Sequence, residues 1–223
     1  MNFIKNLFLS LKEILIVMLS QYLILIISII LYGINKSYYI GTILLLIFDI
    51  SFIILKIRKR HFNISFKGRN YFFCITLGLS ISIIYNMILY RFNLYSYQSS
   101  NISFFLNIFS SGIIGPIFEE VLFRVSFISK LEKWINNKII IIFLSSFIFA
   151  IFHFNVYSSI IAFIIGIING YIYVKERNVR KIFLIHISNN IMSSFLFGYN
   201  FTILILGTFL LSISLISFLR IKE

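Results

Sequence analysis

Two adjacent glutamates and an arginine interrupt a long apolar stretch of this chain, in the segment Pro116-Ile-Phe-Glu-Glu-Val-Leu-Phe-Arg124. Glu120 and Arg124 are four residues apart with the acid first, which is the favoured order for an ion pair along a helix. Glu119 points about 100° away from Glu120 around the same helix. We therefore predict that Glu120 pairs with Arg124 and that Glu119 performs chemistry. The structural alternative, a salt-bridge network of all three side chains, leaves Glu119 without a role.

Two of the three histidines also lie in apolar segments. His153 ends the segment Phe149-Ala-Ile-Phe-His153, and His186 begins the segment His186-Ile-Ser-Asn-Asn190. Asn190 follows His186 by four residues, so both side chains share one helix face, and Asn189 lies close to that face. A lone buried histidine is more often a packed core residue than a catalyst. Two of them, in a chain with few other ionisable residues in its apolar segments, favour a functional site.

The side chains of Glu119, His153, His186 and Asn190 are sufficient for the attack of water on an amide carbonyl. A glutamate removed from water is a stronger base, which suits proton abstraction near neutral pH. A neighbouring histidine helps to polarise the same water. A second histidine and an asparagine amide can donate hydrogen bonds to the developing oxyanion. The residue types therefore predict a peptidase site that Glu120 and Arg124 support.

A zinc site is the alternative arrangement of the same residues. Two histidines and one glutamate form a known zinc ligand set, which here would be Glu119, His153 and His186. The sequence contains no His-Glu-x-x-His segment. With Glu119 as a ligand, the remaining base would be Glu120, which faces another way. We therefore favour a site without a metal or other cofactor and keep zinc as the alternative.

The composition places this site in a membrane. The chain of 223 residues is 60% hydrophobic and 12% charged, with apolar blocks of about twenty residues, the length that crosses a bilayer. Backbone groups in lipid must pair within a helix, which predicts an all-α membrane protein in which about eight transmembrane helices enclose an intramembrane polar site. We expect a single transmembrane domain over 1–223 with a motif-bearing core over 100–197. The predicted spans are 13–33, 39–55, 71–90, 102–128, 139–154, 157–174, 181–197 and 201–219.

The positive charges lie between these spans. The formal net charge is +13, which in a soluble protein would suggest nucleic acid, but the basic residues occupy short loops. Counting alternate loops as cytoplasmic places 17 of the 20 lysines and arginines on one side. The pattern predicts a multi-pass protein of the cell membrane with both termini cytoplasmic, contact with anionic lipid and no nucleic-acid partner.

Two isolated residues remain. Cys74 is the only cysteine, so it forms no internal disulfide and is most simply a small buried hydrophobic residue. Asp49 stands alone in the second predicted span. The sequence is compatible with two roles for Asp49, a structural polar contact or a residue that lines a cavity.

At these motifs the chain resembles the CPBP family of intramembrane endopeptidases, which includes the type II CAAX prenyl proteases and bacteriocin-processing or self-immunity proteins. The family pattern EExxxR, FxxxH and HxxxN occurs here in the same order over roughly residues 100–197, and Gly166 and Gly170 also fit the family. Many members have glycine after the motif arginine, where this chain has Val125. The resemblance implies that Glu119 is the catalytic glutamate, assisted by His153. It also implies an oxyanion site of His186 and Asn190, supported by Glu120 and Arg124.

The sequence thus favours an intramembrane endopeptidase that cleaves a peptide or a membrane-associated protein. One alternative is a non-catalytic scaffold or bacteriocin-immunity protein, which the loss of a motif residue would favour. Another is a proton-coupled transporter, which inverted repeats and interrupted helices in matching halves would favour. All motif residues are present and we find no such repeat. No residue in the sequence indicates recognition of a prenyl group.

The charge asymmetry gives a topological prediction. Reporter fusions after Ser65, Ile135, Asn178 and the C-terminus should report a cytoplasmic position, because lysine and arginine are retained on that side. Fusions after Tyr95 and Val156 should report the opposite side. An extracellular C-terminus would contradict the predicted topology.

Overall fold

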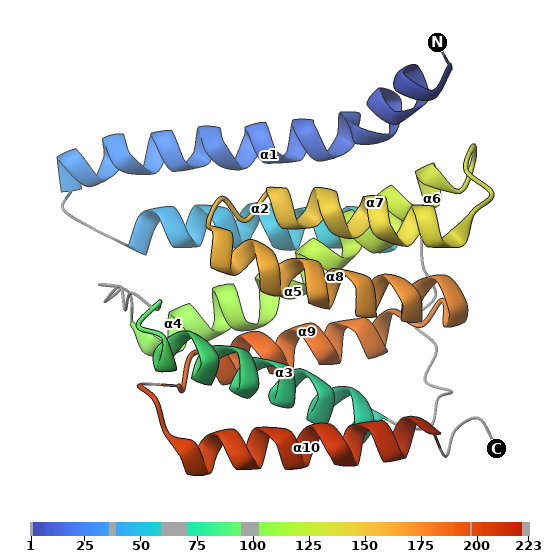
Figure 1. Cartoon of the computed structure of the whole chain (residues 1–223). Coiled ribbons are helices and arrows are strands. Elements are labelled where there is room, and N and C mark those ends of the chain that lie inside the picture. The colour runs from blue at the N-terminus through green and yellow to red at the C-terminus, as the bar shows by residue number, and fades with distance from the viewer. Residues whose placement is uncertain (1, 36–38, 59–70, 95–102, 197, 220–223) are drawn as a thin grey trace. The chain divides into compact units, whose positions relative to one another are not determined.

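The structure is a computed structural model that describes residues 2–35, 39–58, 71–94, 103–196 and 198–219. Within these ranges the chain is helical and contains no strand, so the predicted all-α fold is confirmed. Figure 1 shows the helices. Their bounds are α1 Asn2–Asn35, α2 Tyr39–Arg58, α3 Tyr71–Arg91, α4 Phe104–Asn107, α5 Gly115–Glu120, α6 Ser129–Leu131, α7 Lys138–Ile151, α8 Val156–Glu176, α9 Val179–Ser193 and α10 Phe201–Leu219.

Five of the described helices are long and apolar enough to cross a membrane, which makes the chain a multi-pass membrane protein. These five are Ile4–Gly33, Tyr39–Arg58, Tyr71–Arg91, Phe104–Leu131 and Val156–Glu176. The prediction of eight spans is not confirmed. The apolar helices Lys138–Ile151 and Phe201–Ser217 are shorter, and α9 is not among the apolar helices because polar and charged residues interrupt it.

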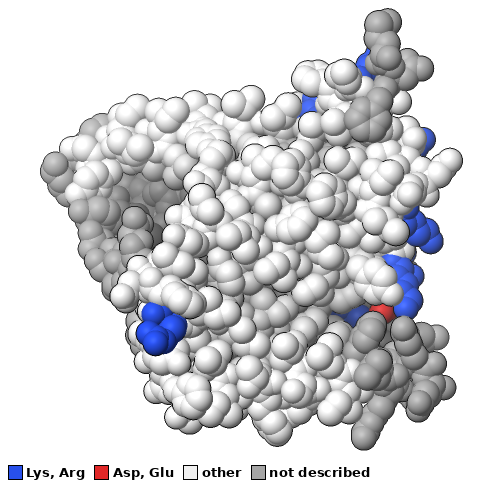
Figure 2. Space-filling view, viewed as in Figure 1, with Lys and Arg blue, Asp and Glu red and all other residues white. Residues whose placement is uncertain are grey.

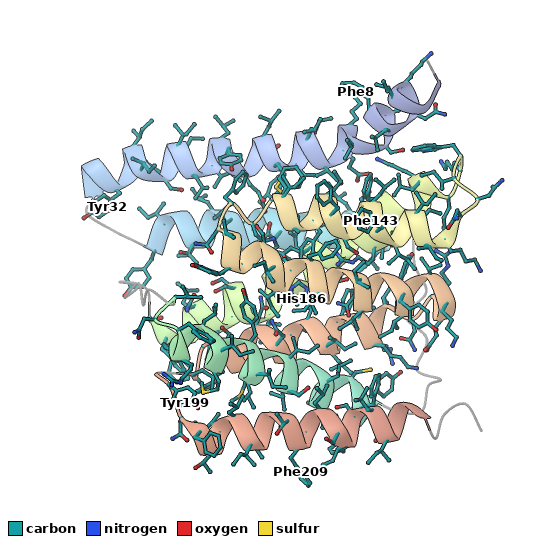
Figure 3. All side chains as sticks on the ribbon, in the orientation of Figure 1. Phe8, Tyr32, Phe143, His186, Tyr199 and Phe209 are labelled. Carbon is teal, nitrogen blue, oxygen red and sulfur yellow. The ribbon has the colours of Figure 1, made fainter. Side chains whose placement is uncertain are left out.

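The outward faces of these helices are apolar. Phe8 on α1 and Phe209 on α10 are each 61% exposed and point away from the neighbouring helices (Figure 3). Large exposed aromatic side chains are unfavourable in water but suit contact with lipid tails. The surface composition therefore agrees with a membrane environment.

The chain divides into two compact units. Unit 1 comprises Met1–Asn63 and Ile117–Arg177, and unit 2 comprises Ile64–Pro116 and Asn178–Glu223. The helical stretch Phe104–Leu131 passes from unit 2 into unit 1.

In unit 1, α7 and α8 pack closely because glycine leaves room for a neighbouring backbone. A Cβ added at Gly166 would lie 2.9 Å from the Ser146 Cβ, and one added at Gly170 would lie 3.2 Å from the Ile142 Cγ2. Small residues four apart commonly permit such approaches between membrane helices. The two glycines set the position of α8, which carries Asn169 between them.

The surface basic residues of unit 1 that the structure describes gather at one end, where α1 begins and where α2, α6 and α8 end (Figure 2). Glu13 of α1 forms ion pairs with Lys56 of α2 and with Lys130 of α6, the latter at 2.6 Å. The indole nitrogen of Trp134 donates a hydrogen bond of 3.0 Å to the Ser10 hydroxyl. These contacts fasten α1 to the rest of the unit at the end that the charge pattern assigns to the cytoplasm.

Unit 2 is built on α3, which packs against both α9 and α10. A Cβ added at Gly78 of α3 would lie 2.2 Å from the Ile185 carbonyl oxygen and 2.1 Å from the Ser188 Oγ on α9. On the α10 side, Ser214 donates a hydrogen bond of 2.8 Å to Thr76 Oγ1. Gly78 therefore fixes the position of α9, the helix that carries His186 and Asn190.

Gly78 gives a test of unit 2. We expect Gly78→Ala to destabilise the protein by about 1–3 kcal/mol, because the added methyl group must displace the backbone of α9. Thermal unfolding in detergent can be followed through the reaction of Cys74, which is 0% exposed, with a thiol-reactive dye.

Gly33→Ala is the matched control, since a Cβ there meets nothing within 4 Å. Alanine should leave stability unchanged or raise it by up to about 1 kcal/mol through its higher helix propensity. Equal unfolding temperatures for the two variants would show that α3 and α9 do not pack as described.

Candidate active site

Glu119 and Glu120 lie in a helical stretch that contains two π-helical segments. Residues Ile108–Ile114 (η1) and Val121–Ile128 (η2) are π-helical, and α5 lies between them. Pro116 does not end the helix, although proline lacks the N–H that continues an α-helix. Insertions of π-helix are uncommon and occur frequently at functional sites. Val125, where many members of the CPBP family have glycine, is a buried residue of η2.

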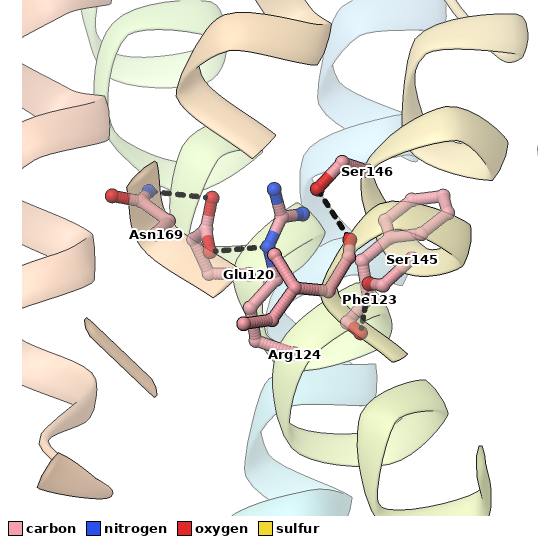
Figure 4. A network of polar contacts seen from close by, with 7 residues as sticks. Glu120, Phe123, Arg124, Ser145, Ser146 and Asn169 are labelled. Atoms are coloured by element: carbon pink, nitrogen blue, oxygen red, sulfur yellow. Dashed lines mark hydrogen bonds and ion pairs between the residues drawn. The ribbon is translucent and has the colours of Figure 1, made fainter. Parts of the chain in front are cut away.

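Glu120 is held by two neighbours inside unit 1. Its Oε2 lies 3.2 Å from the Arg124 Nε in the predicted ion pair, and both side chains are 0% exposed. Its Oε1 accepts a hydrogen bond of 3.0 Å from the Asn169 Nδ2 of α8. Figure 4 shows Asn169 and Arg124 approaching the carboxylate from opposite sides. The charge of Glu120 is thus compensated by one cation and one amide, as a buried carboxylate requires.

Phe149 connects this ion pair to the histidine motif. The guanidinium carbon of Arg124 lies 4.4 Å from the centre of the Phe149 ring, which is a cation–π contact. The Phe149 ring also meets the His153 ring edge to face, with 4.7 Å between the centroids. The terminal nitrogens of Arg124 form no hydrogen bond among the described residues, so the ring face is their main support. Phe149 is therefore the physical link between the first two motifs.

His153 lies in the turn after α7, two residues beyond the last residue of the helix. Its Nδ1 is 3.0 Å from the carbonyl oxygen of Phe149, and a carbonyl oxygen can only accept a hydrogen bond. This contact assigns the proton of a neutral ring to Nδ1. The Nε2 lone pair of His153 is then available to a water or a ligand.

Glu119 has different surroundings from Glu120. It lies on α5 and is partly exposed, whereas Glu120 is fully buried. The described ion pair of Arg124 is with Glu120. The two adjacent glutamates therefore differ in burial, as their positions around the helix predict.

In unit 2, the HxxxN residues lie on α9. His186 is 3% exposed. The Asn190 side chain donates a hydrogen bond of 3.0 Å from Nδ2 to the Ser111 carbonyl oxygen of η1, and its Oδ1 accepts one of 3.1 Å from Asn189. An amide nitrogen carries two hydrogens, so this arrangement leaves one donor for a ligand.

The structure brings the predicted residues together in two sets. Glu119, Glu120, Arg124 and His153 belong to unit 1, and His186 and Asn190 belong to unit 2. Across the residues that the structure describes, no three His, Cys, Asp or Glu side chains form a group that could hold a metal ion. Neither unit alone supplies the zinc ligand set of Glu119, His153 and His186.

Sequence reasoning did not identify Asn169. It lies 49 positions from Glu120 along the chain and is 0% exposed. A signal for it was present, because an amide in an apolar span needs a polar partner. The glycines on either side of it marked that helix as closely packed.

The Glu120 contacts predict how substitutions affect folding. Glu120→Gln and Arg124→Met should each destabilise the protein by about 3–5 kcal/mol, because each leaves a buried charge without its partner. The double variant with both Glu120→Gln and Arg124→Met should recover part of the lost stability. Asn169→Leu should cost about 1.5–3 kcal/mol, the range for a hydrogen bond to a charged group.

Ser146→Ala is the matched control for this series. Ser146 is as buried as Asn169, but its hydroxyl donates only to the Ile142 carbonyl of its own helix, at 2.7 Å. We expect little change in its unfolding temperature. Wild-type stability of both single charge variants would rule out the ion pair as a structural element.

Comparison with known proteins agrees with these motifs. Residues 101–192 match the family model described as type II CAAX prenyl endopeptidase Rce1-like. No curated protein and no solved structure matches the chain. The match contains Glu119, Glu120, Arg124, His153, His186 and Asn190, and it confirms the resemblance to the CPBP family. Over residues 101–192 the chain is therefore similar to the Rce1-like type II CAAX prenyl endopeptidases, a family of membrane-embedded peptidases.

Proposed function

We propose that the protein is an intramembrane endopeptidase that hydrolyses a peptide bond in a peptide or a membrane-associated protein. Glu119 is the base that activates water, and His153 assists it. His186 and Asn190 donate hydrogen bonds to the oxyanion, while Glu120 and Arg124 stabilise the helix that carries Glu119. The enzyme acts in the cell membrane with both termini in the cytoplasm.

The observation that carries this proposal is the difference between the two adjacent glutamates. Glu120 is completely buried between Arg124 and Asn169, which accounts for it as a structural group. Glu119 is the partly exposed carboxyl on the same helix. A membrane helix that carries a second, partly exposed glutamate needs a functional reason, because a charge at mid-membrane costs about 3 kcal/mol.

The proposed reaction uses only side chains of this chain. Glu119 accepts a proton from water while the water oxygen bonds to the carbonyl carbon of the substrate. The lone pair on the His153 Nε2 helps to orient this water. The carbonyl oxygen becomes negative and receives hydrogen bonds from His186 and Asn190. The proton on Glu119 then passes to the amide nitrogen, the C–N bond breaks and two peptides leave.

Site substitutions test this assignment once a substrate is known. Comparing the membrane proteomes of cells that contain the wild type or Glu119→Gln should reveal proteins that remain uncleaved in the variant. With a purified substrate in detergent, Glu119→Gln, His153→Ala and His186→Ala should abolish cleavage and still fold. Asn190→Ala should retain slow turnover, since loss of one oxyanion donor costs about 10²–10³-fold in rate.

Glu132→Gln is the matched control, because Glu132 pairs with Arg177 at the basic end of unit 1. Its activity should equal that of the wild type. The metal content of the same sample is measured beside activity. On the proposed mechanism, exhaustive chelation leaves activity intact. Chelator-sensitive activity with one zinc per chain would instead show a zinc mechanism that uses the same site residues. Full activity in Glu119→Gln would overturn both the base and the proposed function.

A further inference from the structure

A pocket lies at the basic end of unit 1, between the start of α1 and the turn that follows α6. Its volume is about 440 Å³, within the range of pockets that hold small ligands. The proposed reaction uses none of the side chains around it. The lining residues are Asn6, Leu9 and Ser10 from α1, and Lys130, Lys133 and Trp134 from α6 and the turn.

Hydrogen bonds fix the two walls of this pocket to each other. Ser10 is 4% exposed, and its hydroxyl donates to the Asn6 carbonyl oxygen at 2.9 Å. The same hydroxyl accepts a hydrogen bond of 3.0 Å from the indole nitrogen of Trp134. The Lys133 N–H donates to the Lys130 carbonyl oxygen at 3.3 Å, which places these two lysines three residues apart on one face of the turn. The pocket is therefore built before any ligand arrives.

The pocket carries an excess of positive charge. Glu13 forms ion pairs with both Lys56 and Lys130, so a single carboxylate serves two ammonium groups. Lys133 is exposed and forms no ion pair among the residues that the structure describes. Glu132, the acid beside it in the chain, pairs with an arginine instead. Three lysines and one available glutamate leave a net charge of +2, which suits an anion that carries a phosphate group.

An apolar surface of α1 adjoins this positive pocket. Ile4, Phe8 and Leu9 are 76%, 61% and 53% exposed, and Leu9 also lines the pocket. Tryptophan beside lysine is typical of the boundary between lipid tails and headgroups. A soluble phosphate has no use for the apolar surface, whereas a phospholipid has both a phosphate and acyl chains. The two adjoining surfaces therefore favour a lipid as the ligand.

We propose that this pocket binds the headgroup of an anionic phospholipid. Lys130 and Lys133 contact its phosphate, and its acyl chains lie along Ile4, Phe8 and Leu9. The bound lipid joins the start of α1 to the turn after α6. The proposal is independent of the peptidase activity, because it uses no residue of the proposed reaction.

The fluorescence of Trp134 tests this proposal, because Trp134 is the only tryptophan in the chain. The full-length protein is placed in bilayers of phosphatidylcholine that contain rising fractions of phosphatidylglycerol with brominated acyl chains, which quench nearby tryptophan. Brominated phosphatidylcholine is titrated in parallel. Phosphatidylglycerol should bind more tightly than phosphatidylcholine by about fivefold for each lysine that contacts it.

Matched lysine variants separate the pocket from the general charge of the surface. Lys133→Gln should lower the preference for phosphatidylglycerol by about fivefold, and Lys133→Arg should keep it. Lys138→Gln is the control, since Lys138 is exposed at the start of α7 and does not line the pocket. It removes the same charge and should leave the preference unchanged.

Equal quenching by the two brominated lipids would overturn the proposal. Equal losses in Lys133→Gln and Lys138→Gln would also overturn it, because surface charge alone would then explain the preference. Glycerol phosphate, added in solution at millimolar concentration, distinguishes a lipid from a soluble phosphate. It should leave the quenching by phosphatidylglycerol intact, and full relief of quenching would show that the pocket takes soluble phosphates instead.

Discussion

The ion pair between Glu120 and Arg124 is the constraint on which the rest of unit 1 depends. Both side chains are 0% exposed in a helix that crosses lipid, so no water can compensate their charges. Removing one partner of such a pair is strongly destabilising, whereas the pair itself adds little to stability. The buried pair therefore requires further polar and aromatic contacts from neighbouring helices. These contacts determine how α7 and α8 approach the helical segment that carries Glu120 and Arg124.

Each of those contacts has an identifiable cause in the sequence. Asn169 reaches Glu120 because Gly166 and Gly170 allow α8 to approach α7 closely. Phe149 supplies its ring face to Arg124 and its backbone carbonyl to His153. Asn169, which lies outside the three motifs, and Phe149, the first residue of the FxxxH motif, thus both support the ion pair. In unit 1, the buried pair of Glu120 and Arg124 thus fixes the positions of the neighbouring side chains of Asn169 and Phe149.

Acidic residues in this membrane protein fall into two physical classes. Glu13 and Glu132 lie at the basic end of unit 1 and are satisfied by lysine and arginine. Glu120 is paired with Arg124 and Asn169 deep inside the unit. The pairs at the basic end are screened by water, whereas the pair of Glu120 is not.

The sequence by itself determined the helical membrane fold, the family and the pairing of Glu120 with Arg124. These follow from composition, motif order and the geometry of one helix, which are local properties. Only the tertiary structure identified Asn169 and Phe149 as the supports of that pair. It also left the eight-span count unconfirmed, since α9 is too polar and the apolar helices Lys138–Ile151 and Phe201–Ser217 are shorter than the five spans. Contacts between residues as distant as Glu120 and Asn169 depend on how helices pack, and the spacing within any one helix does not encode that packing.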